Sequence, residues 1–224
     1  MVNKETVRRG YDTVAPAYAA QRTADGREAE ILDAFLDHVP DGGRVLDAGC
    51  GQGVPVLRRL AGRAEEANTG TGAGAAAPVG VDLSREQLAR AAAAAPGAHL
   101  AQADLTALPV ADGAVDAVTA FHSLIHVPLD EHQAAIGEFA RVLRPGGRLL
   151  LSEGPGEWTG RNDDWLDSGA AMEWHIAGAE RTRDQLRDAG FTITREWTAD
   201  DELADEESTW VFFSARAEEA GESG

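Results

Sequence analysis

The sequence predicts a doubly wound α/β fold, in which helices cover both faces of a mostly parallel sheet. Short apolar runs suited to buried strands alternate with helical patterns between residues 44 and 152, and this alternation favours a parallel sheet. The first of these runs leads into a turn with alternating glycines, Gly49-Cys50-Gly51-Gln52-Gly53. Such a turn between a strand and a helix lets a ligand approach the bare backbone at the helix N-terminus.

The first forty residues predict a helical cap. One stripe at helical spacing runs through residues 5–22 and consists of Val7, Tyr11, Val14 and Tyr18. Pro16 should break or kink this helix because its ring removes a hydrogen bond and collides with the preceding turn. A second helix is expected at residues 27–39 and should end at Pro40-Asp41-Gly42-Gly43.

The rest of the chain alternates strands and helices. Five strands are expected at residues 44–48, 79–82, 98–103, 115–121 and 148–152. Helices are expected through Leu57 and Leu60, after a Ser84 N-cap, and at residues 130–143. The tail predicts a helix at residues 181–189 and strands at 191–197 and 209–215. Residues 62–78 are rich in Gly, Ala, Thr and Glu and have no apolar period, which predicts a surface insertion.

Composition excludes several classes of protein. The formal net charge is −18, with 38 acidic residues against 20 basic ones, and Lys4 is the single lysine. Such a surface should repel nucleic acid and anionic lipid. Strong acidity with almost no lysine resembles proteins of salt-loving microbes, so we expect a halophilic archaeal source; an ordinary acidic protein is the alternative. Cys50 is the single cysteine, which excludes internal disulfides, and no metal site is expected. No apolar run approaches a membrane span, and the polar N-terminus predicts a cytoplasmic protein.

Three carboxylates follow successive predicted strands. Asp47 precedes the glycine turn, Asp82 ends the second strand, and Asp104 follows the third. Ligands of doubly wound folds bind outside the carboxyl ends of the strands, so these side chains should meet in one crevice. The glycine spacing differs from the G-x-G-x-x-G of dinucleotide sites. Asp47 suits an ammonium group better than a pyrophosphate, and Asp82 suits ribose hydroxyls.

Four segments together resemble the class I S-adenosylmethionine-dependent methyltransferases that act on small molecules. They are VLDAGCGQG, GVDLS, QADLTALPVADGAVDAV and RVLRPGGRLLLSE, and the resemblance covers about residues 11–153. It implies a Rossmann-like methyltransferase fold with a seven-stranded sheet whose last strand is antiparallel. It also implies one domain over residues 1–224, with a helical cap (1–40), a cofactor-binding core (41–153) and an acceptor-pocket segment with C-terminal strands (154–224).

The same resemblance implies the cofactor, S-adenosylmethionine, its product S-adenosylhomocysteine, and the residues that hold it. They comprise the cap tyrosines, the glycine turn and the ends of strands two to four: Tyr11, Tyr18, Asp47, Ala48, Gly49, Cys50, Gly51, Asp82, Leu83, Asp104, Leu105, Phe121 and His122. Judged by residue type alone, Cys50 is a small buried side chain between two glycines.

The acceptor side is less specified. Trp158, Trp174 and His175 lie where the family builds its acceptor pocket, and with Trp165 the tryptophans either wall that pocket or pack a cap onto the sheet. His122, His126 and His175 are candidates for a general base, although each is also compatible with a structural hydrogen-bonded role.

The expected function is methyl transfer to a small-molecule acceptor by in-line displacement at the sulfonium methyl. The alternatives are a domain that binds S-adenosylmethionine without turnover and a nicotinamide-dependent oxidoreductase. The expected assembly is a monomer or a homodimer.

Overall fold

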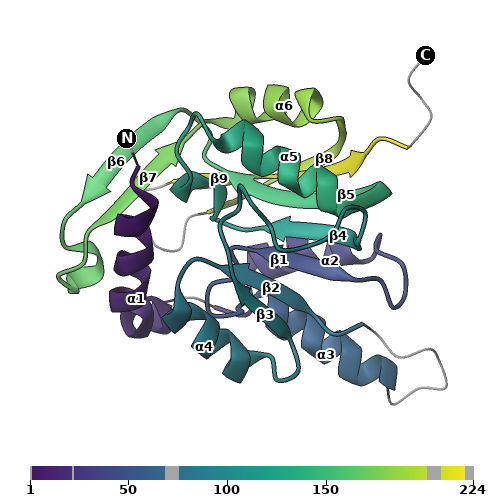
Figure 1. Ribbon diagram of the computed structural model, residues 1–224, viewed down its shortest axis with the longest axis horizontal. Coiled ribbons are helices and arrows are strands. Elements are labelled where there is room, and N and C mark those ends of the chain that lie inside the picture. The colour runs from purple at the N-terminus through teal and green to yellow at the C-terminus, as the bar shows by residue number, and fades with distance from the viewer. Residues whose placement is uncertain (1, 22, 69–75, 201–207, 220–224) are drawn as a thin grey trace.

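The computed structural model describes residues 2–21, 23–68, 76–200 and 208–219. It confirms a Rossmann-like methyltransferase fold with a seven-stranded sheet in the order β3-β2-β1-β4-β5-β9-β8 (Figure 1). Strands β1 to β5 pair in parallel, whereas β9 pairs antiparallel with both β5 and β8. Strand β9 is thus the antiparallel strand that the resemblance implied.

The elements keep the predicted order. The helices are α1 (Lys4–Gln21), α2 (Arg27–Leu36), α3 (Val56–Asn68), α4 (Arg85–Ala94), α5 (His132–Val142) and α6 (Ala179–Asp188). The strands of the large sheet are β1 (Val45–Ala48), β2 (Val79–Asp82), β3 (His99–Gln102), β4 (Val115–Ala120), β5 (Leu143–Glu153), β8 (Phe191–Asp200) and β9 (Thr209–Ala217). Two short 3₁₀ turns, η1 (Leu124–His126) and η2 (Trp165–Asp167), lie between them. The predicted N-cap is confirmed, since Ser84 Oγ accepts from Gln87 N at 3.1 Å.

Both faces of the sheet are buried, because side chains alternate along each strand. Leu149 and Leu151 of β5 pack in one cluster with α5 and α6. Leu150 between them packs in a second cluster with α2 and α3. Phe213 and Phe212 of β9 divide between the same two clusters. Helices therefore cover both faces, and the carboxyl ends of β1 to β4 share one open edge.

Three local predictions need correction. Helix α1 runs through Pro16 without the predicted break; the side chains of Val14, Ala15 and Tyr18 around it are buried, and this packing compensates for the lost hydrogen bond. The predicted insertion at 62–78 begins as helix, since α3 extends to Asn68; its residues 69–75 lie outside the described ranges.

The third error is an antiparallel hairpin that the sequence did not predict, β6 (Trp158–Asn162) with β7 (Met172–Ile176). It lies beside α1, away from the large sheet (Figure 1). Strand β6 is largely exposed, so it lacks the apolar alternation that identifies a strand. None of the described helices is both long and apolar enough to cross a bilayer.

Candidate cofactor and acceptor site

The glycine turn after β1 forms one wall of a cavity at the carboxyl edge of the sheet. Gly49 and Gly51 have φ of 83° and 51° and both line this cavity. A Cβ at Gly49 would lie 2.2 Å from Ser123 Cβ, whereas a Cβ at Gly51 would meet nothing closer than 4.0 Å. Gly49 is thus required by close packing, and Gly51 leaves open space beside bare backbone.

Asp82 is held rigidly at the end of β2. Its two carboxylate oxygens accept from Gly51 N and Ser84 N, each at 2.8 Å, which fixes the carboxylate against the glycine turn. Burial raises the pKa of Asp82 to about 6 despite these hydrogen bonds. A site that penalises an unpaired negative charge favours a ligand carrying hydroxyl donors or a positive charge.

Asp104 is paired with the helical cap. Lys4 Nζ of α1 lies 2.7 Å from Asp104 Oδ2 and also contacts Glu131, while Thr106 donates to Asp104 Oδ1. Burial raises the pKa of Asp104, but the hydrogen bonds from Lys4 and Thr106 outweigh it and leave the pKa below its usual value. An adenine amine at Asp104 would therefore share this carboxylate with Lys4.

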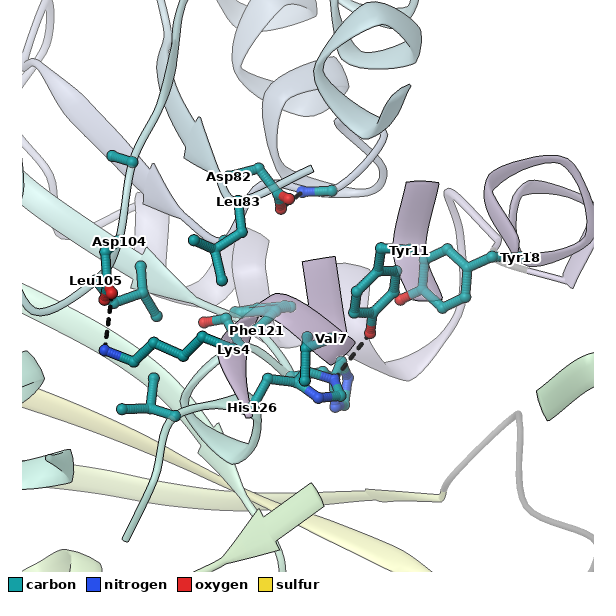
Figure 2. Close-up of a pocket in the computed structure, with 16 residues that line it drawn as sticks. Lys4, Val7, Tyr11, Tyr18, Asp82, Leu83, Asp104, Leu105, Phe121 and His126 are labelled. Atoms are coloured by element: carbon teal, nitrogen blue, oxygen red, sulfur yellow. Dashed lines mark hydrogen bonds and ion pairs between the residues drawn. The ribbon is translucent and has the colours of Figure 1, made fainter. Parts of the chain in front are cut away.

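Figure 2 shows how these parts enclose the cavity. Leu83 and Leu105 face each other across it, with Asp82 and Asp104 beside them and Val7 of α1 on the opposite side. Of the predicted cofactor residues, the structure brings together Tyr11, Tyr18, Gly49, Gly51, Asp82, Leu83, Asp104, Leu105, Phe121 and His122.

Three predicted cofactor residues do not line this cavity. Asp47 is 3% exposed and accepts from Thr119 Oγ1 at 2.9 Å, and burial raises its pKa to about 7. Its charge therefore acts on the cavity from behind the glycine turn. Ala48 lies in the sheet core and Cys50 packs with Leu57 between α3 and α4, because β1 turns their side chains away from the ligand edge.

A second, aromatic cavity adjoins the first. It is lined by the hairpin, η2 and the start of β9, including Trp158, Trp165, Trp174, Trp210 and Glu157. The two cavities share Tyr11, Tyr18, His122 and His126. Trp165 makes ring contacts with Tyr11, Tyr18 and Trp174 at centroid distances of 5.7, 5.7 and 5.6 Å. The tryptophans therefore both wall a cavity and pack the hairpin onto α1.

The three candidate histidines have different surroundings. His126 is 6% exposed, and its nitrogens contact Glu173 O and the Tyr11 hydroxyl, both at 2.9 Å. Burial lowers its pKa to about 4, so His126 is a neutral, fully bonded bridge between η1, β7 and α1. His175 lines neither cavity, since its Nδ1 accepts from Leu129 N at 3.2 Å; the predicted acceptor role of His175 is not supported.

His122, like His126, lines both cavities. Its Nε2 lies 2.6 Å from Glu28 Oε1, and both side chains are 10% exposed. Its φ of 51° is in the left-handed region, a conformation that costs energy in a residue other than glycine and that concentrates at functional sites.

Glu28 and Lys4 were not predicted as site residues, although the sequence carries a signal for both. Glu28 lies three, four and seven residues before Ile31, Leu32 and Phe35, so it belongs to the apolar face of α2. Lys4 likewise extends the Val7–Tyr11 stripe of α1. A charged residue on an apolar face indicates a buried partner.

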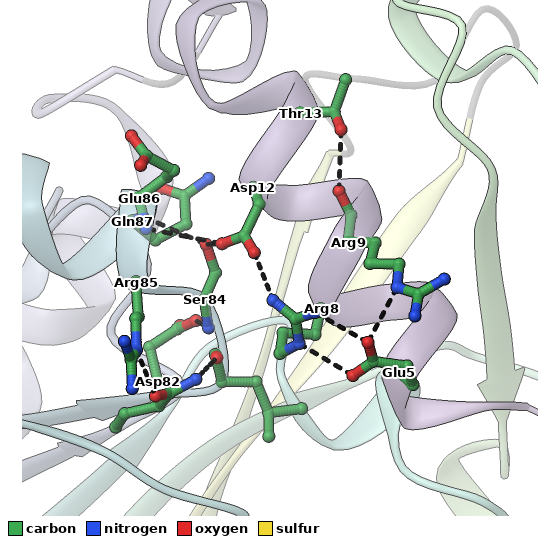
Figure 3. A network of polar contacts seen from close by, with 12 residues as sticks. Glu5, Arg8, Arg9, Asp12, Thr13, Asp82, Ser84, Arg85, Glu86 and Gln87 are labelled. Atoms are coloured by element: carbon green, nitrogen blue, oxygen red, sulfur yellow. Dashed lines mark hydrogen bonds and ion pairs between the residues drawn. The ribbon is translucent and has the colours of Figure 1, made fainter.

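The cap is tied to the cofactor edge by a polar network (Figure 3). Asp12 of α1 accepts from Ser84 Oγ at 2.6 Å, and Arg8 pairs with both Asp12 and Glu5. Because Ser84 N also donates to Asp82, α1 is linked through two hydrogen bonds to the Asp82 carboxylate. Across the described residues, no group of three or more His, Cys, Asp or Glu side chains is arranged to hold a metal ion.

Comparison with known proteins agrees with this geometry. A family model described as a methyltransferase domain matches residues 45–147. Methyltransferase GfsG of Streptomyces halstedii is 37% identical over 138 residues, which cover 58% of this chain and 44% of that protein. The 27-O-demethylrifamycin SV methyltransferase of Amycolatopsis mediterranei is 36% identical over 139 residues, 58% and 46% of the two chains. The chain thus spans about half the length of these curated relatives.

The crystal structure of the [4+2]-cyclase SpnF superposes with a TM-score of 0.69 at 24% identity and covers 95% of both chains. Other solved neighbours are described as S-adenosylmethionine-dependent methyltransferases. Fold and family model agree on the class: residues 45–147 match a methyltransferase domain, within a sheet that has the strand order of the methyltransferase fold. The cofactor of this class is S-adenosylmethionine.

Proposed function

We propose that the protein transfers the methyl group of S-adenosylmethionine to a small-molecule acceptor. When bound, this cofactor supplies an electrophilic methyl group on a sulfonium. The observation that carries the proposal is the pair of joined cavities, of which one contains the strand-end carboxylates and the other is aromatic. A methyl donor and an acceptor held in adjoining cavities meet the need for close, oriented and dry approach.

The residues of the first cavity fit this cofactor. Gly51 leaves bare backbone beside open space, and Asp82 offers a rigid carboxylate to ribose hydroxyls. Leu83, directly after β2, and Leu105, in the segment after β3, face each other across a gap suited to a flat base (Figure 2). Buried Asp47 and Asp82, whose pKa values burial raises to about 7 and about 6, favour a ligand with positive charge.

A small molecule is the proposed acceptor class. The aromatic cavity is enclosed by the hairpin and α1, and Trp158 and Trp174 are its proposed acceptor contacts. The net charge of −18 opposes nucleic acid as a partner. The rifamycin methyltransferase named above acts on a small molecule by its description, which supports the same class here.

Titration calorimetry with S-adenosylmethionine tests the proposal. Replacing Asp82 by alanine should weaken binding by about 1.5–3 kcal/mol, the scale of hydrogen bonds to a charged group. Asp41→Ala, at an exposed position before β1, is the matched control and should bind as the parent does. Equal binding by folded Asp82→Ala would remove Asp82 from the site, and binding of NAD instead would favour the oxidoreductase.

A domain that binds the cofactor without methyl transfer is the second candidate. The observation that favours it is the close fold match to a [4+2]-cyclase. Release of S-adenosylhomocysteine in the presence of an acceptor separates the two, because binding alone leaves the cofactor intact.

A further inference from the structure

We propose that His122, held by Glu28, is the base that takes the proton of the acceptor, and that the acceptor group is a hydroxyl on a bulky apolar or aromatic molecule. This inference rests on the proposed function and names its acceptor and proton path. It goes beyond the methyltransferase fold, since methyl transfer as such does not require a base.

Position is the first argument. His122 follows β4 and lines both the cofactor cavity and the aromatic cavity. Tyr11, Tyr18 and His126 are the other residues shared by the two, but both ring nitrogens of His126 are engaged and its pKa is lowered to about 4 by burial. His122 is therefore the titratable side chain at the junction that has a nitrogen to offer.

Orientation is the second argument. His122 Nε2 lies 2.6 Å from Glu28 Oε1. An ionised Glu28 would accept a hydrogen bond from Nε2–H and leave the lone pair of the ring on Nδ1. Among the described residues, Nδ1 has no hydrogen-bond partner. A carboxylate behind an imidazole sets its tautomer and stabilises the cation that forms when the ring accepts a proton.

The ring is also locked in place. The backbone N–H of His122 donates to Ser152 Oγ at 2.8 Å. Trp210 and Phe212 of β9 contact its ring edge-to-face at centroid distances of 4.6 and 6.1 Å. These contacts hold the left-handed backbone at φ 51°. Helix α2 and strands β5 and β9 therefore fix the orientation of the His122 ring together. A catalytic group requires such a fixed orientation.

Chemistry follows from this arrangement. The acceptor O–H bond breaks and its proton goes to His122 Nδ1. The oxygen electron pair forms the new bond to the methyl carbon, while the electrons of the carbon–sulfur bond remain on sulfur as a neutral thioether. The imidazolium beside Glu28 then returns its proton to solvent. A tryptophan-lined cavity suits a bulky apolar or aromatic body for this hydroxyl.

The decisive experiment compares two phenols of different acidity, phenol and 4-nitrophenol, as methyl acceptors at about pH 8. Phenol keeps its proton at this pH and needs a base, whereas the nitrophenol is largely ionised already. His122→Gln should lower methyl transfer to phenol by about 10²–10⁴-fold and transfer to 4-nitrophenol by less than about tenfold. Equal losses on both would make His122 a purely structural residue and overturn the proposal. His38→Gln, the same change at an exposed site, should leave both rates unchanged.

Two further readouts do not depend on turnover. Nitrogen NMR of the histidine-labelled protein, assigned with His122→Gln, should show the proton on Nε2 of His122; a proton on Nδ1 would overturn the orientation argued here. Glu28→Leu should lose that preference, whereas Glu28→Gln, which keeps an accepting oxygen, should retain it.

If calorimetry shows cofactor binding but neither phenol is methylated, the hydroxyl acceptor is excluded. If the cofactor itself does not bind, the proposed function fails first.

Discussion

Asp47 lies behind the candidate cofactor cavity without lining it. Its carboxyl is buried under the glycine turn and receives one hydrogen bond, from Thr119. Burial, with a smaller contribution from nearby Asp82, raises its pKa to about 7. An unfolded chain would ionise the same group near 3.8. The folded state therefore binds this proton more tightly, and its stabilising effect is lost as pH rises through about 7.

Replacing Asp47 by asparagine should therefore change the pH dependence of stability. Asparagine keeps the oxygen that accepts from Thr119 but has no proton to lose. We expect the free energy of unfolding of Asp47→Asn, relative to the parent, to increase by roughly 1–3 kcal/mol from pH 5 to pH 8. Denaturant melts across this pH range measure the difference. The exposed Asp41→Asn should track the parent, and a parallel curve for Asp47→Asn would show that Asp47 is not the titrating group.

At the scale of elements, α1 acts as the cover of the cofactor cavity. Lys4, Val7, Tyr11 and Tyr18 line that cavity from one side of the helix. Gly10 lies where α1 crosses the hairpin, and a Cβ there would lie 2.6 Å from Ala171 O and 2.9 Å from Met172 Cε. The close approach of helix and hairpin thus depends on a missing side chain.

Gly10→Ala should lift α1 from β7. The substitution gains about 1 kcal/mol of helix propensity, but the collision with a backbone oxygen should exceed it and cost about 1–3 kcal/mol net. We expect a lower melting temperature together with weaker S-adenosylmethionine binding, measured by thermal melts and calorimetry.

Gly137→Ala in α5 provides the matched control for this substitution. No atom lies within 4 Å of a Cβ at that position, so the propensity gain should appear as a higher melting temperature with unchanged cofactor affinity. A stabilised Gly10→Ala with normal affinity would contradict the close packing of α1 on the hairpin.

At the scale of the whole molecule, charge is the dominant feature. A net charge of −18 on 224 residues means that carboxylates repel one another over the whole surface. Local pairs such as Arg183–Glu196 and Arg59–Asp33 are partly exposed, and exposed pairs contribute little. Repulsion should therefore oppose the compact state when salt is dilute.

Thermal melts in KCl should show a melting temperature that rises with salt. The Debye length is about 30 Å at 0.01 M and about 3 Å at 1 M, so screening removes repulsion between all but neighbouring charges. Salting-out of apolar surface should also raise the melting temperature. If it contributes, the melting temperature should rise more steeply in sulfate than in KCl. A flat or falling melting temperature in KCl would contradict adaptation to high salt.

The sequence by itself determined the alternation of strands and helices, the edge of the sheet that binds ligand, and most of the cavity wall. Apolar periodicity and the glycine turn are local properties, and strand-end residues such as Asp82 and Asp104 follow from them. The cofactor class followed from the resemblance to class I methyltransferases, which the four motifs carry together.

Tertiary structure alone decided which residues meet across long stretches of chain. It placed Glu28 on His122 and Lys4 on Asp104, turned Asp47 toward Thr119, and paired the exposed strand β6 with β7. A local pattern can show that Glu28 and Lys4 lie on apolar helix faces, but it does not identify their partners, which lie far away along the chain. Packing of α1 and α2 against the sheet selects the partner, and burial then fixes the protonation of the groups that it encloses.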